Sequence, residues 1–303
     1  MPGSSLRQVL RDSAAAHVAV GHFNATEAIA LKGIVEAARS LQVPVIIGVT
    51  EREREFLGTH QLAALVHSIR EEHEVQLFLD ADHTHTLSQA IEAAKAGFDA
   101  IVFDCSSHSL EENMRQTKTA VEAVKSINPS ILVEGEIGDI GVGSRIHPNV
   151  PESCRILTTP DEARQFVDWT RVEMLAPAVG NMHGLTSAMA NGHERKRLNI
   201  ERIRQIKAAT DIFLTLHGGS GTGDDDLQDA ILAGINIVHI NTEIRLAFRK
   251  GLERSLAENP DNIAPYELLQ PAVQAVKEAA QARLRLFNTR AAANSLHEVE
   301  VAL

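Results

Sequence analysis

Side chains that bind metals or move protons follow several apolar runs of this sequence. The run at 75–81 is followed directly by Asp82 and His83, His183 stands in the segment GNMHG, and His217 closes the run IFLTLH. Zinc enzymes commonly use three protein ligands and an open fourth position, and a neighbouring carboxylate can serve as general base. These residue types predict a metal site with Asp82 beside it, provided that the fold brings the histidines together.

The apolar runs that carry these residues alternate with stretches of helical periodicity, such as 87–97 and 110–127. Near-continuous apolar strands that alternate with helices are typical of a parallel sheet covered on both faces. Eight such runs in a chain of this length predict a (β/α)8 barrel, with a doubly wound sheet as the alternative fold. The predicted strands are 17–23, 43–49, 75–81, 100–104, 131–137, 172–180, 212–217 and 235–240.

We expect one barrel domain over residues 1–303, with a helical extension at about 264–290. In such barrels the loops that follow the strands build the active site at one end. A single histidine at a strand end is more often solvated or hydrogen-bonded than a metal ligand. Three histidines after three strands of one barrel meet on the same rim, and this favours the metal site.

Glycines and a helix start follow the last two predicted strands. The segment HGGSG spans 217–221 and INTE spans 240–243. Loops at these places in barrels commonly hold a phosphate with main-chain N–H groups and a helix N-terminus. The alternative is a tight turn and an ordinary helix cap. The groups predicted to donate to the phosphate belong to Gly218, Gly219, Ser220, Asn241 and Thr242.

Two carboxylates, Glu134 and Glu136, stand two residues apart on the fifth predicted strand and therefore on one face of it. Because buried charges need partners, we interpret them as groups near the metal. By contrast, the charged segments 50–56 and 193–197 are interpreted as solvated faces.

Composition excludes several classes of function. The net charge of −11 argues against a nucleic-acid surface. Two cysteines are too few for a disulfide framework, and no apolar run is long enough to span a bilayer. The chain starts without a basic segment and a long apolar run, so we expect a cytoplasmic protein. We also expect a homo-oligomer, either a dimer or a tetramer.

From about residue 5 to residue 290 the chain resembles the class II, zinc-dependent ketose-bisphosphate aldolases. The segments VGHFNATE, PVIIGVTEREREFLG, DCSSHSLEEN, GNMHG, LHGGSG and INTE match the family's motifs in order. The resemblance implies that Asp82 moves the proton at the reacting hydroxyl of a ketose phosphate. It implies zinc, and a monovalent cation near the phosphate site. The implied metal ligands are His83, His183, His217 and, in a second buried position, Glu136; the implied ligands of the glycerone-phosphate end are Gly184, Gly218, Ser220, Asn241 and Thr242.

Several residues depart from the family's pattern. Ser187 stands near the place of a lysine that grips the phosphate, and His239 replaces an asparagine. Tyr266 replaces an arginine for the far phosphate of a sugar bisphosphate. We therefore expect an aldehyde partner without a terminal phosphate, and a protonated His239 could support the near phosphate. The mobile loop that usually carries an acidic residue has Ser144, Arg145 and His147 instead.

Three functions fit these residues. The first is a zinc aldolase that splits or joins glycerone phosphate, or a close analogue, and an aldehyde. The second is a different metal-assisted lyase or epimerase on the same scaffold, which the missing loop carboxylate keeps open. The third is a non-catalytic barrel that binds a phosphorylated metabolite, and the presence of Asp82 speaks against it because a binding module needs no general base.

Overall fold

The computed structural model describes residues 4–73, 75–141, 143, 145–150, 154 and 156–289. Parallel strands close into a barrel in the order β1, β10, β9, β7, β5, β4, β3, β2. This confirms the predicted barrel and excludes the doubly wound sheet, because a closed sheet has no edge strand. The barrel strands are β1 Val20–Asn24, β2 Val45–Gly48, β3 Leu77–Thr84, β4 Ala100–Phe103, β5 Leu132–Ile137, β7 Met174–Pro177, β9 Phe213–Leu216 and β10 Ile235–Ile240.

Helices surround the barrel and begin and end at the expected signals. For example, the helix after β3 starts behind Thr86, whose hydroxyl accepts from the Gln89 N–H, and ends at Gly97 with a φ of 89°. Two short strands, β6 Ile146–His147 and β8 Leu185–Thr186, pair outside the barrel. The surrounding helices are α2 Ala28–Leu41, α3 Glu51–Leu57, α4 Thr59–His73, α5 Leu87–Ala96, α6 Leu110–Ile127, α7 Pro160–Thr170, α8 Ser187–Ala190, α9 Ile200–Thr210, α10 Asp224–Ala233 and α11 Thr242–Glu258.

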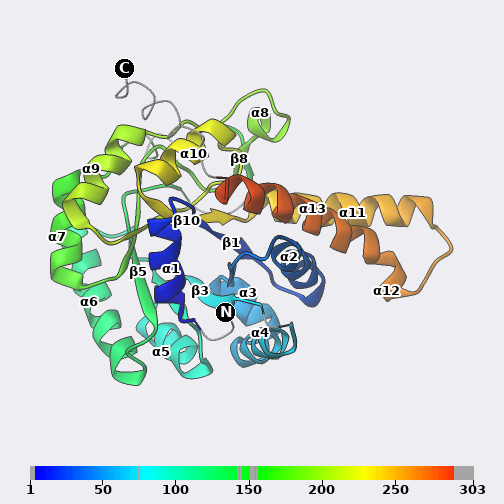
Figure 1. Ribbon diagram of the computed structural model, residues 1–303, viewed down its shortest axis with the longest axis horizontal. Coiled ribbons are helices and arrows are strands. Elements are labelled where there is room, and N and C mark those ends of the chain that lie inside the picture. The colour runs from blue at the N-terminus through cyan, green and yellow to red at the C-terminus, as the bar shows by residue number, and fades with distance from the viewer. Residues whose placement is uncertain are drawn as a thin grey trace, which may run out of the picture.

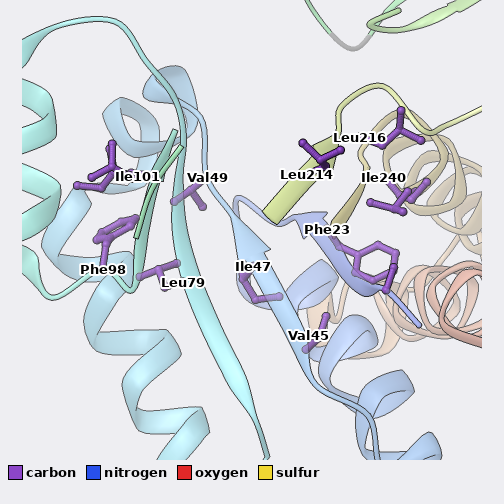
Figure 2. Close-up of a cluster of buried hydrophobic side chains, with 14 of the residues drawn as sticks. Phe23, Val45, Ile47, Val49, Leu79, Phe98, Ile101, Leu214, Leu216 and Ile240 are labelled. Carbon is purple, nitrogen blue, oxygen red and sulfur yellow. The ribbon is translucent and has the colours of Figure 1, made fainter. Parts of the chain in front are cut away.

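The largest apolar cluster lies between the strands and the helices. Alternate side chains of the strands point outward into it, as Figure 2 shows for Ile47, Leu79 and Ile240. This two-residue alternation explains why the strand sequences are apolar on the outer side whatever stands on the inner side.

The inward-facing side chains form layers along the barrel axis. The layer at the amino ends of the strands is apolar, and helix α1 Leu6–Ala15 covers it with Leu6, Val9 and Leu10. Two residues further along the strands the inward positions include His22, Asp80, Glu134, Thr215 and His239, all buried. The apolar layer consists of Val20, Ile46, Phe78, Ala100, Leu132, Met174, Phe213 and Ile237.

The predicted C-terminal extension is two helices, α12 Pro265–Leu268 and α13 Gln270–Phe287, where one long helix was expected. Pro271 explains the break, because proline lacks an N–H and is tolerated only in the first turn of a helix. Helix α13 packs on α2 and α11. Helices α11, α12 and α13 form an arm, and the end of the arm with α12 projects away from the barrel (Figure 1). In the described part of the chain, helices lack the combination of length and apolar character that crossing a membrane requires.

Candidate active site

An irregularity in β3 points two consecutive side chains into the mouth of the barrel. The strand was expected to end at Ala81, but it continues to Thr84 with a register shift against β4 between Ala81 and Thr84. His83 has a φ of 45°, which is uncommon for a residue with a side chain. Regular alternation would place Asp82 and His83 on opposite faces. The irregularity lets both line the same cavity.

The side chains predicted as metal ligands lie together. One atom each of His83, Glu136, His183 and His217 falls within 4.8 Å of the others. The ring centroids of the histidines are 4.7, 5.0 and 5.8 Å apart. They lie on β3 and in the loops after β7 and β9, which are far apart in sequence, so the closed barrel is what brings them together.

Carboxylates behind the histidines fix which ring nitrogen faces the centre. His83 Nδ1 lies 2.8 Å from Asp104 Oδ2, which leaves Nε2 for a metal. His217 Nε2 lies 2.7 Å from Glu134 Oε1, which leaves Nδ1. Such carboxylate–histidine pairs commonly orient metal ligands.

Polar atoms at the centre of this cluster are buried without a hydrogen-bond partner. They are His183 Nε2, His217 Nδ1 and Glu136 Oε2, of which the last two lie 3.1 Å from each other. Unpaired buried polar atoms are costly, and three that converge on one point suit a cation. The residues therefore fit a zinc ion with nitrogen ligands and a carboxylate within reach.

Electrostatics within the cluster divide the histidines. Burial lowers the pKa of His83, but Asp82 and Asp104 raise it to about 9. Burial and the neighbouring histidines hold the pKa of His183 well below its ordinary value. Burial lowers the pKa of His217, but Glu134 and Glu136 raise it well above its ordinary value. Because ligating imidazoles must be neutral, a metal bound here would require His83 and His217 to lose a proton, whereas His183 is already neutral.

Asp82 is suited to remain ionised. Its Oδ2 accepts a hydrogen bond of 2.8 Å from Asn24 Nδ2, and its Oδ1 lies 3.7 Å from His83 Nε2. Burial raises the pKa of Asp82, but the positive charge of His83 and the bond from Asn24 bring it below its usual range. A carboxylate that is ionised, 3 % exposed and next to a metal ligand can accept a proton from a bound substrate.

The cluster opens into a cavity of about 680 Å³. Its walls come from loops that follow different strands, as the fold predicts. Asp82, His83 and His183 lie on the wall, while His217 and Glu136 lie behind it. The other lining residues used below are Asn24, Arg52, Arg145, Gly184, Gly218, Ser220, His239, Asn241, Thr242 and Arg245.

The predicted phosphate ligands lie on one side of this cavity, with one exception. Gly184, Gly218, Ser220, Asn241 and Thr242 line it where α11 begins. Asn241 Oδ1 is buried there without a partner. The exception is Gly219, whose N–H donates to the His239 carbonyl at 3.0 Å and whose α-carbon faces Val238. Its amide is therefore already used.

The expectation that His239 carries a positive charge is wrong for this arrangement. Its ring stacks between His22 and His217, at centroid distances of 3.4 and 4.1 Å. Burial, and then the charges of the neighbouring histidines, put the pKa of His239 well below its ordinary value. His239 lines the cavity as a neutral ring, 3.7 Å from Asp82 Oδ1.

Two segments interpreted as solvated contain buried groups. In 50–56, Arg54 donates to the Val49 carbonyl at 2.6 Å and to Thr84 Oγ1 at 3.0 Å, and thereby holds the irregular end of β3. In 193–197, Lys196 is 3 % exposed. A charged residue next to exposed ones carries no burial signal in the sequence, so these two were missed.

Asn24 and Asp104 were also not singled out from the sequence. Asn24 is the last residue of β1 and Asp104 directly follows β4, and that position in a barrel is itself a signal. Asn24 holds Asp82 and Asp104 holds His83.

The residues that depart from the aldolase pattern fall in different places. Arg145 lines the cavity, and His147 belongs to β6 beside Gly184; Ser144 lies outside the described residues. Ser187 begins α8 and is not on the cavity wall. Tyr266 is 71 % exposed on α12, far along the arm, so within one chain it does not reach the cavity.

The chain matches a known protein family over nearly its whole length. The family model of class II fructose-bisphosphate aldolases matches residues 4–292, and the chain belongs to this family. Its members are lyases, so the chain is an enzyme of that class and the interpretation as a non-catalytic barrel is excluded.

Curated relatives and a solved structure extend the match. A sulfofructosephosphate aldolase of Alkalicoccus urumqiensis is 32% identical over 89% of this chain and 91% of its own. A fructose-bisphosphate aldolase of Thermus caldophilus is 30% identical over 93% and 97%. The crystal structure of the YdjI aldolase from Escherichia coli K12 has a TM-score of 0.79 and 29% identity, and covers 95% of this chain and 98% of that one.

Proposed function

We propose that the protein is a zinc-dependent aldolase that reversibly cleaves a ketose phosphate into glycerone phosphate, or a close analogue, and an aldehyde. The observation that carries the proposal is the convergence of His83, His183 and His217 beside an ionised Asp82 in one cavity. The proposed substrate is not fructose 1,6-bisphosphate.

Cleavage of a 4-hydroxy ketone leaves an electron pair on the donor fragment and removes a proton from the C4 hydroxyl. Zinc held by the three histidines would supply Lewis-acid stabilisation of that negative charge. Asp82 accepts the hydroxyl proton during cleavage and returns it during condensation. Asn24 keeps the Asp82 carboxylate in place, since it donates to the oxygen that faces away from His83.

The donor's phosphate would bind where α11 begins. The side chains and amides of Ser220, Asn241 and Thr242 meet the positive end of a 17-residue helix there. Gly218 has a φ of 63°, and a β-carbon there would lie 2.1 Å from the Met182 carbonyl oxygen. Only glycine can bring the loop this close to the segment that carries His183.

The aldehyde would occupy the part of the cavity formed by the loops after β2, β3 and β5. Arg52 and Arg145 lie there. Their guanidinium groups suit an aldehyde that carries an anion other than a phosphate, such as a carboxylate or a sulfonate. The relative named for a sulfofructose phosphate is consistent with this choice.

The test is a comparison of kcat/KM for fructose 1,6-bisphosphate and for ketose 1-phosphates whose aldehyde part ends in hydroxyl, carboxylate or sulfonate. We expect an anionic, non-phosphate aldehyde to be preferred. Loss of one charge-assisted hydrogen bond corresponds to a decrease in kcat/KM of about ten- to a hundredfold. Arg145→Ala should therefore lower kcat/KM for that substrate by this factor.

A matched control is Arg164→Ala, since Arg164 lies on α7 away from the cavity and donates to the Ala209 carbonyl. Fructose 1,6-bisphosphate as the best substrate would contradict the proposed acceptor. If the zinc-loaded protein releases glycerone phosphate from none of these ketose phosphates, the proposed reaction itself is contradicted.

A further inference from the structure

A buried lysine lies beneath the loops of the active site. Lys196 belongs to the segment between α8 and α9 and is 3 % exposed. Its main chain bridges to Thr222, and its N–H donates to the Gly221 carbonyl at 3.0 Å. The backbone of Lys196 is therefore fixed against the glycine-rich loop.

The ammonium group joins two loops. Lys196 Nζ donates to the Met182 carbonyl and to the Gly218 carbonyl, each at 2.7 Å. Met182 directly precedes His183, and Gly218 directly follows His217. One ammonium thus connects the peptide units next to two of the predicted metal ligands, and one of those peptide units belongs to the phosphate loop.

The arrangement of these two carbonyl groups suits a cation between them. Their oxygens approach the same point, and two carbonyl dipoles that meet with their negative ends repel each other. Main-chain carbonyls that converge in this way are also ligands for a bare monovalent cation. In this chain the point is filled by the lysine side chain.

In the part of the chain that the structure describes, no carboxylate forms an ion pair with Lys196. The carboxylate whose charge acts on it is Glu243, and Arg283 already holds Glu243 through two hydrogen bonds of 2.8 Å. Burial lowers the pKa of Lys196 to about 7. A phosphate anion bound at the loop that Lys196 holds would favour the charged form of the amine.

We propose that the ammonium group of Lys196 takes the place of a bound monovalent cation beside the predicted phosphate site. It holds together the loops that carry His183 and Gly218 and makes phosphate binding independent of a free monovalent cation. Lys196 is a positioning residue, which acts through the two carbonyls and not by touching the substrate. It takes over the role of the lysine that the aldolase pattern places near Ser187, from a later position in the chain.

This inference rests on the proposed phosphate site, but its test does not need the aldol reaction. The probe is inorganic phosphate, and the quantity is its dissociation constant, measured by titration calorimetry with the zinc-loaded protein. Each titration is run in choline chloride and repeated in potassium and in ammonium chloride at equal ionic strength. At a pH below the pKa of about 7, where Lys196 carries its charge, the wild-type protein should bind phosphate equally, within about twofold, in all three salts.

Two variants separate charge from packing. Lys196→Ala opens the space between the carbonyls, so phosphate affinity should fall about tenfold or more in choline and recover in potassium or ammonium. Lys196→Met fills the space without a charge, so its affinity should fall in all three salts. The matched control is Lys207→Met, because Lys207 also donates to a main-chain carbonyl, that of Ile212 at 2.6 Å, but lies on α9 outside the site.

Two results would overturn the inference: a wild-type protein that needs potassium or ammonium to bind phosphate, or a Lys196→Ala variant that binds it normally in choline. The first needs no variant and therefore does not depend on whether a substituted protein folds. Zinc content is measured alongside, since a variant that loses zinc reports on the metal site. If phosphate binding follows Lys196 but no ketose phosphate is cleaved, the proposed reaction fails and this inference stands.

Discussion

The two ends of the barrel carry inward side chains of different kinds. At the amino ends of the strands the inward side chains are apolar, from Val20 on β1 to Ile237 on β10, and helix α1 seals them from water. Two and four residues further along, the same strands carry histidines and carboxylates, such as His22 on β1 and Glu136 on β5. The outer faces of the strands are apolar along their whole length.

The comparison shows that stability and chemistry are placed on different layers of one structure. A buried charge is tolerated at the carboxyl end because each one has a partner, as Asp80 has His22 and Glu134 has His217. The amino end has no such demand. Substitutions at the two ends should therefore separate loss of fold from loss of function.

The largest effect is expected from a metal ligand. His183→Ala should reduce zinc from one ion per chain to none and reduce aldol cleavage to background, because the remaining groups cannot complete the site. The midpoint of thermal unfolding of the metal-free protein should stay the same. Zinc is measured by atomic emission, and full zinc occupancy in this variant would refute the ligand assignment.

The next effect concerns Asp82. Asp82→Ala should keep zinc and lower kcat by about 10²–10⁴, the range for a general base. Asn24→Ala, which leaves the carboxylate but removes its anchor, should cost less. Wild-type turnover by Asp82→Ala would assign the proton transfer to another group.

A substitution in the apolar layer should do the reverse. Phe78→Ala, two residues before Asp80 on the same strand, should lower the free energy of unfolding by about 3–5 kcal/mol through the cavity it leaves. At a temperature where the variant is folded, zinc content and kcat should remain near the wild-type values. A variant that keeps its stability but loses zinc would show that the two layers are not independent.

The smallest effect is expected from Glu134, the carboxylate that orients the predicted metal ligand His217. Glu134→Gln keeps the shape of the residue that orients His217 but removes its charge, and the loss of such a partner typically weakens metal affinity about 10- to 100-fold. Competition with a zinc chelator of known affinity measures this. An unchanged affinity would mean that the barrel alone orients His217.

Much of this arrangement follows from the sequence. The alternation of apolar runs and helices predicts the barrel, and the polar residues that end the runs place Asp82, His83, His183 and His217 on one rim. Because alternate residues of a strand share a face, the sequence also predicts that Glu134 and Glu136 lie on the same face of β5.

What the sequence does not reveal depends on contacts between distant segments. The turn of β3 at His83 is held by Arg54, and Lys196 is buried only because the loops after β7 and β9 close over it. Both stand among exposed charged residues in the sequence. The charge of His239 was misjudged for the same reason, since its stacking partners come from β1 and β9.

The most direct test of the central claim needs no knowledge of the aldehyde. Glycerone phosphate is incubated in deuterium oxide with the zinc-loaded protein, and exchange of a hydrogen at the hydroxyl-bearing carbon next to the carbonyl is followed by proton NMR. An enzyme that stabilises the donor fragment as proposed should exchange one hydrogen far faster than the solvent does, and His183→Ala should exchange none. Exchange at the uncatalysed rate with the wild-type protein, or equal exchange with His183→Ala, would contradict the assignment of this site as a metal-dependent aldolase centre.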